Sequence, residues 1–209
     1  GVKVVLPAMH DTGSAYLAVP ARDDRAVYLS SGTWSLLGVE NERAITDAAS
    51  CAANFTNEGG VDGTTRLLKN ITGMWLLEQC LAQWRREGRQ YSYAECHEMA
   101  AAAAPSAEFI DPDDRLFAAP SDMPAAIRSY CSGHGMRIPS SDGEMIRLIY
   151  DSLAAKYAEV FAKLKDVSGK PLDALHIIGG GANNELLDRL TAKACNVKVV
   201  AGPSEGTAL

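Results

Sequence analysis

The chain has 209 residues, of which 47% are hydrophobic and 22% charged, and its formal net charge is -6. This composition is typical of a folded protein with one substantial core or two small ones, and it excludes a disordered chain. No run of basic residues is longer than Arg85-Arg86, which argues against a surface that neutralises nucleic-acid phosphates. We therefore expect small-molecule ligands and no nucleic-acid partner.

Membrane insertion and secretion are also disfavoured. No apolar stretch approaches the ~18 residues that span a bilayer, and Lys3 and Pro7 interrupt the opening segment. We expect no membrane association and a cytoplasmic location. The cysteines are odd in number and form no C-x-x-C pair, so we predict reduced, buried thiols and neither a disulfide frame nor a metal site. They are Cys51, Cys80, Cys96, Cys131 and Cys195.

The first forty residues indicate β-structure. An apolar run at 2–9 predicts a strand, and a short helix is predicted at 12–19, ended by Pro20. Two further strands are predicted at 26–30 and 35–39, joined by a turn. Residues 40–62 are rich in turn formers and are predicted to be irregular.

Helices are predicted to dominate the middle of the chain. Apolar residues recur at helical spacing over 64–86, which predicts one long helix. A second helix is predicted at 92–104, and the proline-containing stretch 107–124 is predicted to be a long connection, a candidate contact with another domain. The strongest helical pattern begins after Ser141 and runs to about residue 167.

The last part of the chain alternates strands and helices. We predict a strand at 174–178, a glycine turn, a helix at 183–195 and a strand at 197–200. Three meander strands followed by helix, strand, helix and strand is the element order of the actin-like, or ribonuclease-H-like, α/β fold. Ordinary doubly wound proteins alternate strands and helices from the start.

Three consecutive glycines, Gly179, Gly180 and Gly181, end the predicted strand and open a helix. Their missing Cβ atoms leave room for a nucleotide against the backbone. The segment is neither a P-loop nor a dinucleotide fingerprint, because Asn184 stands where the third glycine of the fingerprint would be. A tight turn with positive φ would explain the same glycines, so both interpretations stay open.

Asp11 directly follows the first predicted strand, and α/β folds place reactive groups at strand ends. Its carboxylate could accept the proton of an alcohol that attacks a phosphorus atom. It could equally cap the helix at 12–19, and spacing alone does not separate these two roles. His10 on its own is interpreted as a structural histidine.

The remaining polar candidates are weaker in isolation. The hydroxyls and amides of the turn at 30–34 could hold phosphate oxygens or a water on Mg²⁺, but ordinary turn chemistry also explains them. Asn70, in the predicted long helix, either makes a structural hydrogen bond or contacts a ligand hydroxyl, and Glu78 could equally face water. The tryptophans are predicted to be core residues; they are Trp34, Trp75 and Trp84.

Together these motifs resemble the FGGY family of carbohydrate kinases over essentially the whole chain, and within it the members that act on L-rhamnulose. The strings that carry the resemblance lie at 10–15, 28–36, 57–60, 67–71, 175–181 and 201–203. The resemblance implies that residues 1–209 form the second, ATP-binding domain of a two-domain sugar kinase with an actin-like fold. It further implies transfer of phosphate from MgATP to the 1-hydroxyl of L-rhamnulose.

The resemblance also assigns roles to individual positions. The implied residues are Asp11 as general base, His10, Asp11, Thr12 and Asn70 as sugar contacts, and Thr33, Glu78, Gly180 and Gly181 as ATP contacts. Glu78 stands where we would expect a glutamine that touches ATP. A carboxylate there lacks a donor and repels phosphate.

The family resemblance further implies an N-terminal domain before this segment and more helices after it, so we expect the isolated segment to be inactive. Two alternatives stay open. One is a kinase for another sugar or polyol, such as xylulose, fuculose or glycerol. The other is a non-catalytic actin-like nucleotide-binding module, in which Asp11 would position water or Mg²⁺. The glycine turn fits both alternatives, whereas the string around Asp11 and the presence of Asn70 favour a sugar kinase.

Overall fold

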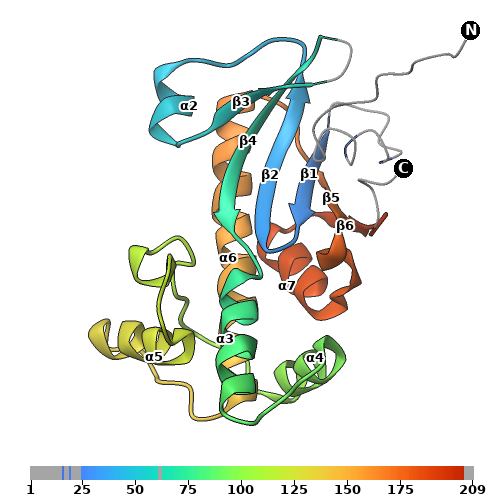
Figure 1. The fold of residues 1–209 in the computed structure, drawn as a ribbon. Coiled ribbons are helices and arrows are strands. Elements are labelled where there is room, and N and C mark those ends of the chain that lie inside the picture. The colour runs from blue at the N-terminus through green and yellow to red at the C-terminus, as the bar shows by residue number, and fades with distance from the viewer. Residues whose placement is uncertain (1–15, 17–18, 20–24, 61–62, 205–209) are drawn as a thin grey trace, which may run out of the picture.

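The computed structural model describes residues 16, 19, 25–60 and 63–204. Its centre is a six-stranded sheet of strand order β3-β4-β2-β1-β5-β6. The strands are β1 (Ala26–Ser31), β2 (Trp34–Asn41), β3 (Thr56–Gly59), β4 (Thr65–Thr72), β5 (Ala174–Ile178) and β6 (Lys198–Ala201). Figure 1 shows the sheet at one end of the molecule and a group of helices at the other.

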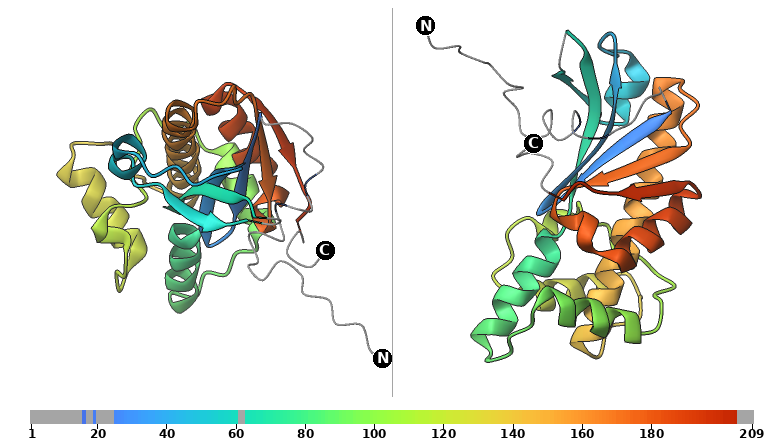
Figure 2. Two further views of the ribbon diagram at one scale, coloured as in Figure 1. Left: turned by 90° about the horizontal axis from the view of Figure 1, so that it is seen from above. Right: turned by 90° about the vertical axis from the view of Figure 1, so that its right-hand side faces the viewer.

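Helices surround the sheet and form the other end of the described fold. They are α2 (Ala48–Ala52), α3 (Trp75–Arg86), α4 (Tyr93–Ala102), α5 (Met123–Gly133), α6 (Asp142–Ser168) and α7 (Glu185–Cys195), with short 3-10 turns η1 (Arg115–Phe117) and η2 (Gly180–Asn183). Helix α6 crosses one face of the sheet and continues among the helices at the far end (Figures 1 and 2). Its 27 residues correspond to a rod of ~40 Å at 1.5 Å per residue.

Local sequence sets the limits of α6. The Ser141 side chain accepts a hydrogen bond from the Glu144 amide at the start, and Gly169 adopts a left-handed conformation with φ 64° at the end. Between these caps, apolar residues on one stripe are fully buried in the main core. Tyr157 is buried on this stripe, and its hydroxyl lies 2.7 Å from Ser35 Oγ in β2. This buried hydrogen bond ties the helix to the sheet.

The strand register brings two turns to one edge of the sheet. Strand β1 pairs antiparallel with β2 and parallel with β5, so that Ser30 lies opposite both Leu36 and Ile178. The turn between β1 and β2 and the glycine turn after β5 therefore emerge side by side. This is the edge that faces α4 and the start of α3 in Figure 1.

Most predicted elements are confirmed. The strands predicted at 26–30, 35–39, 174–178 and 197–200 are β1, β2, β5 and β6, and the helices predicted at 92–104, 142–167 and 183–195 are α4, α6 and α7. The strand predicted at 2–9 lies outside the described residues. Of the helix predicted at 12–19, only residues 16 and 19 are described.

The single long helix predicted at 64–86 is wrong. The segment forms strand β4, a corner at Gly73 and helix α3. A Cβ at Gly73 would lie 2.6 Å from the carbonyl oxygen of Gly32, so only glycine allows the chain to turn this closely over the hairpin. Pairing with β2 and β3 on both sides of β4 outweighs the helical spacing of its leucines.

Two connections contain more secondary structure than predicted. Residues 40–62, expected to be irregular, include helix α2 and strand β3. The connection predicted at 107–124 contains η1, and helix α5 after it was not predicted. Asp122 caps α5 by accepting a hydrogen bond from the Ala125 amide, and Pro124 occupies its first turn.

Burial corrects two further predictions. Trp34 is 56% exposed at the start of β2, so it is not a core residue, whereas Trp84 is fully buried and Trp75 partly so. All five cysteines are free, but only Cys80, Cys96 and Cys131 are buried; Cys195 is half-buried and Cys51 exposed. In the described part of the chain, no helix combines the length and the apolar character that a bilayer span requires.

Candidate functional site

A cavity of about 430 Å³ lies at the edge of the sheet where the two turns emerge. It is lined by Gly32, Thr33, Met74, Glu78, Tyr93, His97, Gly180, Gly181, Asn183 and Asn184. All four residues assigned to ATP from the sequence, Thr33, Glu78, Gly180 and Gly181, are in this set. The volume lies within the ~300–1,000 Å³ that small-molecule sites occupy.

The hairpin wall of the cavity is held by the corner between β4 and α3. The amides of Gly73 and Trp75 donate to the Thr33 carbonyl oxygen at 3.2 and 3.1 Å, and the Met74 amide donates to the Gly32 carbonyl oxygen at 2.9 Å. These three bonds fix the carbonyl groups of Gly32 and Thr33. The turn is thus braced by a second segment of chain.

Thr33 and Glu78 form a direct pair inside the cavity. Thr33 Oγ1 donates to Glu78 Oε1 at 2.9 Å. Glu78 lies in the first turn of α3, where the positive end of the helix dipole favours a carboxylate. Because the Thr33 proton points to Glu78, this hydroxyl presents only lone pairs to a ligand.

The three consecutive glycines serve different purposes. Gly179 has φ +83°, a left-handed conformation that the turn requires. A Cβ at Gly181 would lie 2.0 Å from Ser31 Oγ, so close packing against β1 explains this glycine. A Cβ at Gly180 would meet nothing within 4 Å, and Gly180 is exposed on the cavity wall. The tight-turn interpretation therefore explains Gly179, close packing against β1 explains Gly181, and space for a ligand remains the interpretation for Gly180.

Helix α7 begins at the cavity. The Asn184 side chain caps it by accepting a hydrogen bond from the Leu187 amide at 3.1 Å. Asn183 and Asn184 both line the cavity, so the amino-terminal end of an 11-residue helix faces the ligand space. Such an end favours negatively charged groups.

The wall formed by α4 was not predicted from the sequence. Tyr93 and His97 are four residues apart, which places them on one face of the helix, and both line the cavity. Tyr93 is 51% exposed, so its ring is available to a ligand. Burial lowers the pKa of His97, which favours its neutral form. Only their helical spacing could have indicated a shared face, and nothing in the sequence places that face beside the glycine turn.

Of the residues assigned to the sugar, the structure describes only Asn70. Asn70 is an exposed residue of strand β4 and not part of a helix, and it does not line the cavity. His10, Asp11 and Thr12 lie outside the described residues. Tyr16, the described residue nearest to them in the sequence, is buried with Val19 against Ile178, the last residue of β5 before the glycine turn.

Metal-binding side chains do not gather in the part of the chain that the structure describes. No group of three or more His, Cys, Asp or Glu residues there could hold a metal ion. Thr33 and Glu78 are among the residues that offer acceptor oxygens to the cavity. These are hard ligands of the kind that Mg²⁺ prefers, and two of them would suit an ion that is mainly held by phosphate oxygens.

Comparison with protein families identifies the domain. Residues 27–209 match the model of the FGGY family of carbohydrate kinases, C-terminal domain. The chain belongs to this family. The resemblance seen in the sequence motifs is thereby confirmed.

Two relatives of the FGGY domain are named rhamnulokinase. The protein from Bacteroides thetaiotaomicron is 50% identical over 208 residues, which are 100% of this chain and 42% of that protein. The protein from Pectobacterium carotovorum subsp. carotovorum is 43% identical over 208 residues, again 100% of this chain and 41% of that protein. The chain thus spans about two fifths of the length of these relatives.

A solved structure confirms the predicted fold class. The crystal structure of xylulose kinase from Rhodospirillum rubrum superposes with a TM-score of 0.65 at 16% identity. The match covers 94% of this chain and 39% of the xylulose kinase chain. The FGGY domain therefore has the mixed α/β, actin-like fold expected from its element order.

A buried carboxyl group lies one turn beyond the cavity. Asp188 in α7 is 8% exposed, and its Oδ1 has no hydrogen-bond partner among the described residues. Burial, and secondarily the charge of Glu185, raises the pKa of Asp188 to about 7 from 3.8. The native state therefore binds the Asp188 proton more tightly than the unfolded state does.

Substitution at Asp188 should change how stability depends on pH. As the pH rises from about 4 to about 7, unfolded Asp188 ionises before native Asp188, so the free energy of unfolding falls over this window and then levels off. We expect Asp188→Asn to match the wild type near pH 4 and to exceed it by about 4 kcal/mol near pH 8, at ~1.4 kcal/mol for each unit by which the pKa is raised. Urea denaturation at both pH values measures this difference, and an equal effect at both would contradict it.

The two cavity glycines provide a matched pair of substitutions. Gly180→Ala meets open space, so it should keep the free energy of unfolding within ~0.5 kcal/mol but weaken ADP binding roughly tenfold, because the new methyl group occupies ligand space. Gly181→Ala should cost about 1–3 kcal/mol of stability through its clash with Ser31. Thermal unfolding and calorimetric titration of the full-length protein test both. Unchanged ADP affinity in Gly180→Ala would remove that residue from the ligand site.

Proposed function

We propose that this chain is the nucleotide-binding, C-terminal part of a two-domain kinase that transfers the γ-phosphoryl group of MgATP to the 1-hydroxyl of L-rhamnulose. The observation that carries the proposal is the single cavity lined by Thr33, Glu78, Gly180 and Gly181. The two rhamnulokinase relatives, 50% and 43% identical over the whole chain, support L-rhamnulose as the sugar.

Each wall of the cavity suits one part of a nucleotide. Tyr93 and His97 offer aromatic rings to an adenine base. Gly180 allows the nucleotide to approach the backbone, and the start of α7 favours its phosphates. The hairpin with Thr33 would then lie toward the terminal phosphates. Phosphoryl transfer needs mainly such positioning and charge balance from the protein.

Thr33 and Glu78 are the described residues that would contact Mg²⁺ or its water ligands. When bound with ATP, Mg²⁺ neutralises phosphate charge. The hydrogen bond between the two side chains keeps both oxygens at the cavity wall. Their lone pairs can accept hydrogen bonds from metal-bound water. An ionised phosphate oxygen has no proton, so it could not donate such a bond to them.

The sugar side of the reaction rests on Asp11, His10, Thr12 and Asn70. We infer that Asp11 accepts the proton of the 1-hydroxyl as this oxygen attacks the γ-phosphorus. The packing of Tyr16 against Ile178 supports this role, because it brings a nearby part of the sequence to the strand that leads into the glycine turn. Asn70 would contact the sugar from strand β4.

The proposal includes an N-terminal domain that completes the site. Closure of two domains over both substrates would exclude water and align the reacting atoms. The isolated segment is therefore expected to be inactive. A panel of L-rhamnulose, xylulose, fuculose and glycerol, assayed with the full-length protein, separates the proposed substrate from its alternatives.

Asp11→Asn tests the proposed base. We expect kcat to fall by at least ~10²-fold, because asparagine cannot take the proton, while ADP affinity changes less than about twofold. Sugar-dependent ADP release and calorimetric titration of the full-length protein measure these two quantities. Retained turnover in Asp11→Asn would reject the assignment, and ATP-driven polymerisation without sugar-dependent ADP release would favour a non-catalytic module.

Glu78→Gln tests the electrostatic cost of a carboxylate beside phosphates. Glutamine keeps an acceptor for Thr33, removes the negative charge and adds a donor, so the affinity for ATP without Mg²⁺ should rise roughly fivefold, equivalent to about 1 kcal/mol. Glu98→Gln is a matched control, since Glu98 is exposed on α4 and does not line the cavity. Equal or weaker binding of metal-free ATP in Glu78→Gln would contradict the expected repulsion between this carboxylate and the phosphates.

A further inference from the structure

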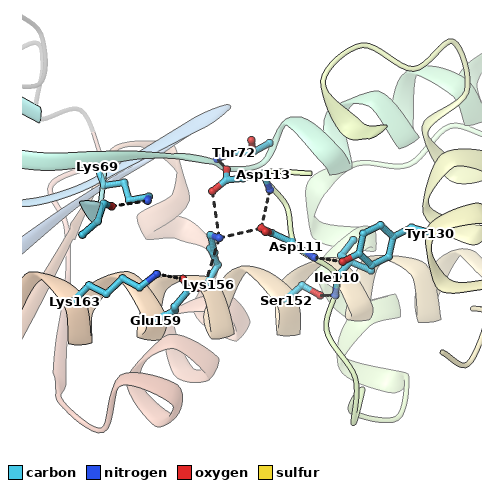
Figure 3. Close-up of polar contacts among 11 residues, drawn as sticks. Lys69, Thr72, Ile110, Asp111, Asp113, Tyr130, Ser152, Lys156, Glu159 and Lys163 are labelled. Carbon is cyan, nitrogen blue, oxygen red and sulfur yellow. Dashed lines mark hydrogen bonds and ion pairs between the residues drawn. The ribbon is translucent and has the colours of Figure 1, made fainter. Parts of the chain in front are cut away.

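A second polar cluster lies beside the corner between β4 and α3. Lys156 projects from α6, and its Nζ lies 3.0 Å from Asp111 Oδ1 and 3.5 Å from both Asp113 Oδ2 and Glu159 Oε2 (Figure 3). The Lys156 side chain is only 11% exposed. Burial opposes its charge, but the hydrogen bond to Asp111 and the surrounding carboxylates outweigh burial and raise the pKa of Lys156. Lys156 therefore stays charged and pairs with Asp111 and Asp113, which lie in the connection between α4 and α5.

One of these acids reaches the end of a strand. Asp113 Oδ1 accepts a hydrogen bond from the Thr72 amide, the last residue of β4, at 2.7 Å. Figure 3 shows Asp113 between Lys156 and Thr72, bound to both. A charged acceptor makes this a stronger bond than one between neutral groups.

The same connection forms a second hydrogen bond to the corner. The Phe117 carbonyl oxygen in η1 accepts a hydrogen bond from Trp75 Nε1 at 3.1 Å. The corner from Thr72 to Trp75 is thus held at both ends, and its amides in turn donate to the carbonyl groups of Gly32 and Thr33. A continuous series of contacts leads from Lys156 to the turn that lines the cavity.

We propose that Asp113, oriented by Lys156, is a positioning residue for nucleotide binding: it holds the β4–α3 corner and, through that corner, the Gly32–Thr33 turn. The proposal rests on the proposed function, in that it takes the cavity as the nucleotide site. It gives a role to the connection that the sequence predicts at 107–124 and suggests only as a contact for another domain.

The connection has anchors that do not involve Lys156 or Asp113 side chains. The Ile110 amide donates to Ser152 Oγ at 3.0 Å, and the Asp111 amide donates to the Tyr130 hydroxyl at 3.3 Å. Substitutions at Lys156 or Asp113 should therefore leave the connection in place and loosen only the corner. This separation makes the proposal testable.

The experiment compares Asp113→Ala, Asp113→Asn and Lys156→Met in the full-length protein, with Lys163→Met as a matched control. Lys163 lies on the same helix and pairs only with Glu159 among the ion pairs of the described residues. Three quantities are measured: hydrogen exchange of the amides at 72–75, the Kd for MgADP, and the KM values for ATP and sugar.

Asp113→Ala should speed exchange at the corner and raise the Kd for MgADP and the KM for ATP roughly tenfold, with the sugar KM changed less than about twofold. Asp113→Asn keeps an acceptor oxygen for Thr72 and should recover to within about threefold of the wild type. Lys156→Met should fall between them, and Lys163→Met should match the wild type.

Two results would overturn the proposal. One is a folded Asp113→Ala protein with wild-type corner exchange and wild-type MgADP affinity, and the other is Asp113→Asn as impaired as Asp113→Ala. If Asp113→Ala loses its cooperative unfolding transition, Lys156→Met decides by the same two measurements. A wild-type protein that binds no MgADP would refute the proposed nucleotide site itself, and this failure is visible before any substitution is made.

Discussion

The parallel pairing of β1 with β5 is the constraint on which the rest of the site depends. It sets Ser30 opposite Ile178, so the chain must leave both strands at the same edge, with Ser31 pressed against the glycine turn. A residue with a side chain at position 181 would collide with Ser31 Oγ and push the two turns apart. The cavity exists because the backbone of one turn can approach the side chain of the other this closely.

Much of this arrangement could be predicted from the sequence. The strands around the hairpin, the capped helix α6 and the glycine turn carry strong local signals, and the four ATP positions carried by family resemblance meet in one cavity. The corner at Gly73 could not be read in the same way, because Leu67 and Leu68 fit helical spacing as well as a buried strand. What decides the structure there is pairing with two other strands. Strand β2 is distant in the sequence, and β3 lies in a stretch that was predicted to be irregular. Tyr93 and His97 were missed for the same reason, since only tertiary packing brings α4 to the glycine turn.

Carboxylates around the nucleotide site are used in contrasting ways. Glu78 faces the cavity and is stabilised by the start of α3 and by the Thr33 hydroxyl. Asp188, one helical turn behind the cavity, is buried with a pKa raised to about 7. Asp113 is compensated by Lys156 and holds a backbone amide. A single type of group therefore lines the cavity at Glu78, holds a proton tightly at Asp188 and fixes a backbone amide at Asp113, according to its surroundings.

The continuity of α6 limits how the molecule can move. The helix is unbroken over 27 residues and packs against the sheet, α7, α4 and α3, which together supply the walls of the cavity. A stiff rod shared by all of these walls prevents them from swinging apart as separate bodies. Admission and release of a nucleotide must then depend on side-chain rotation at the rim, or on displacement of whatever covers the cavity from outside this fold.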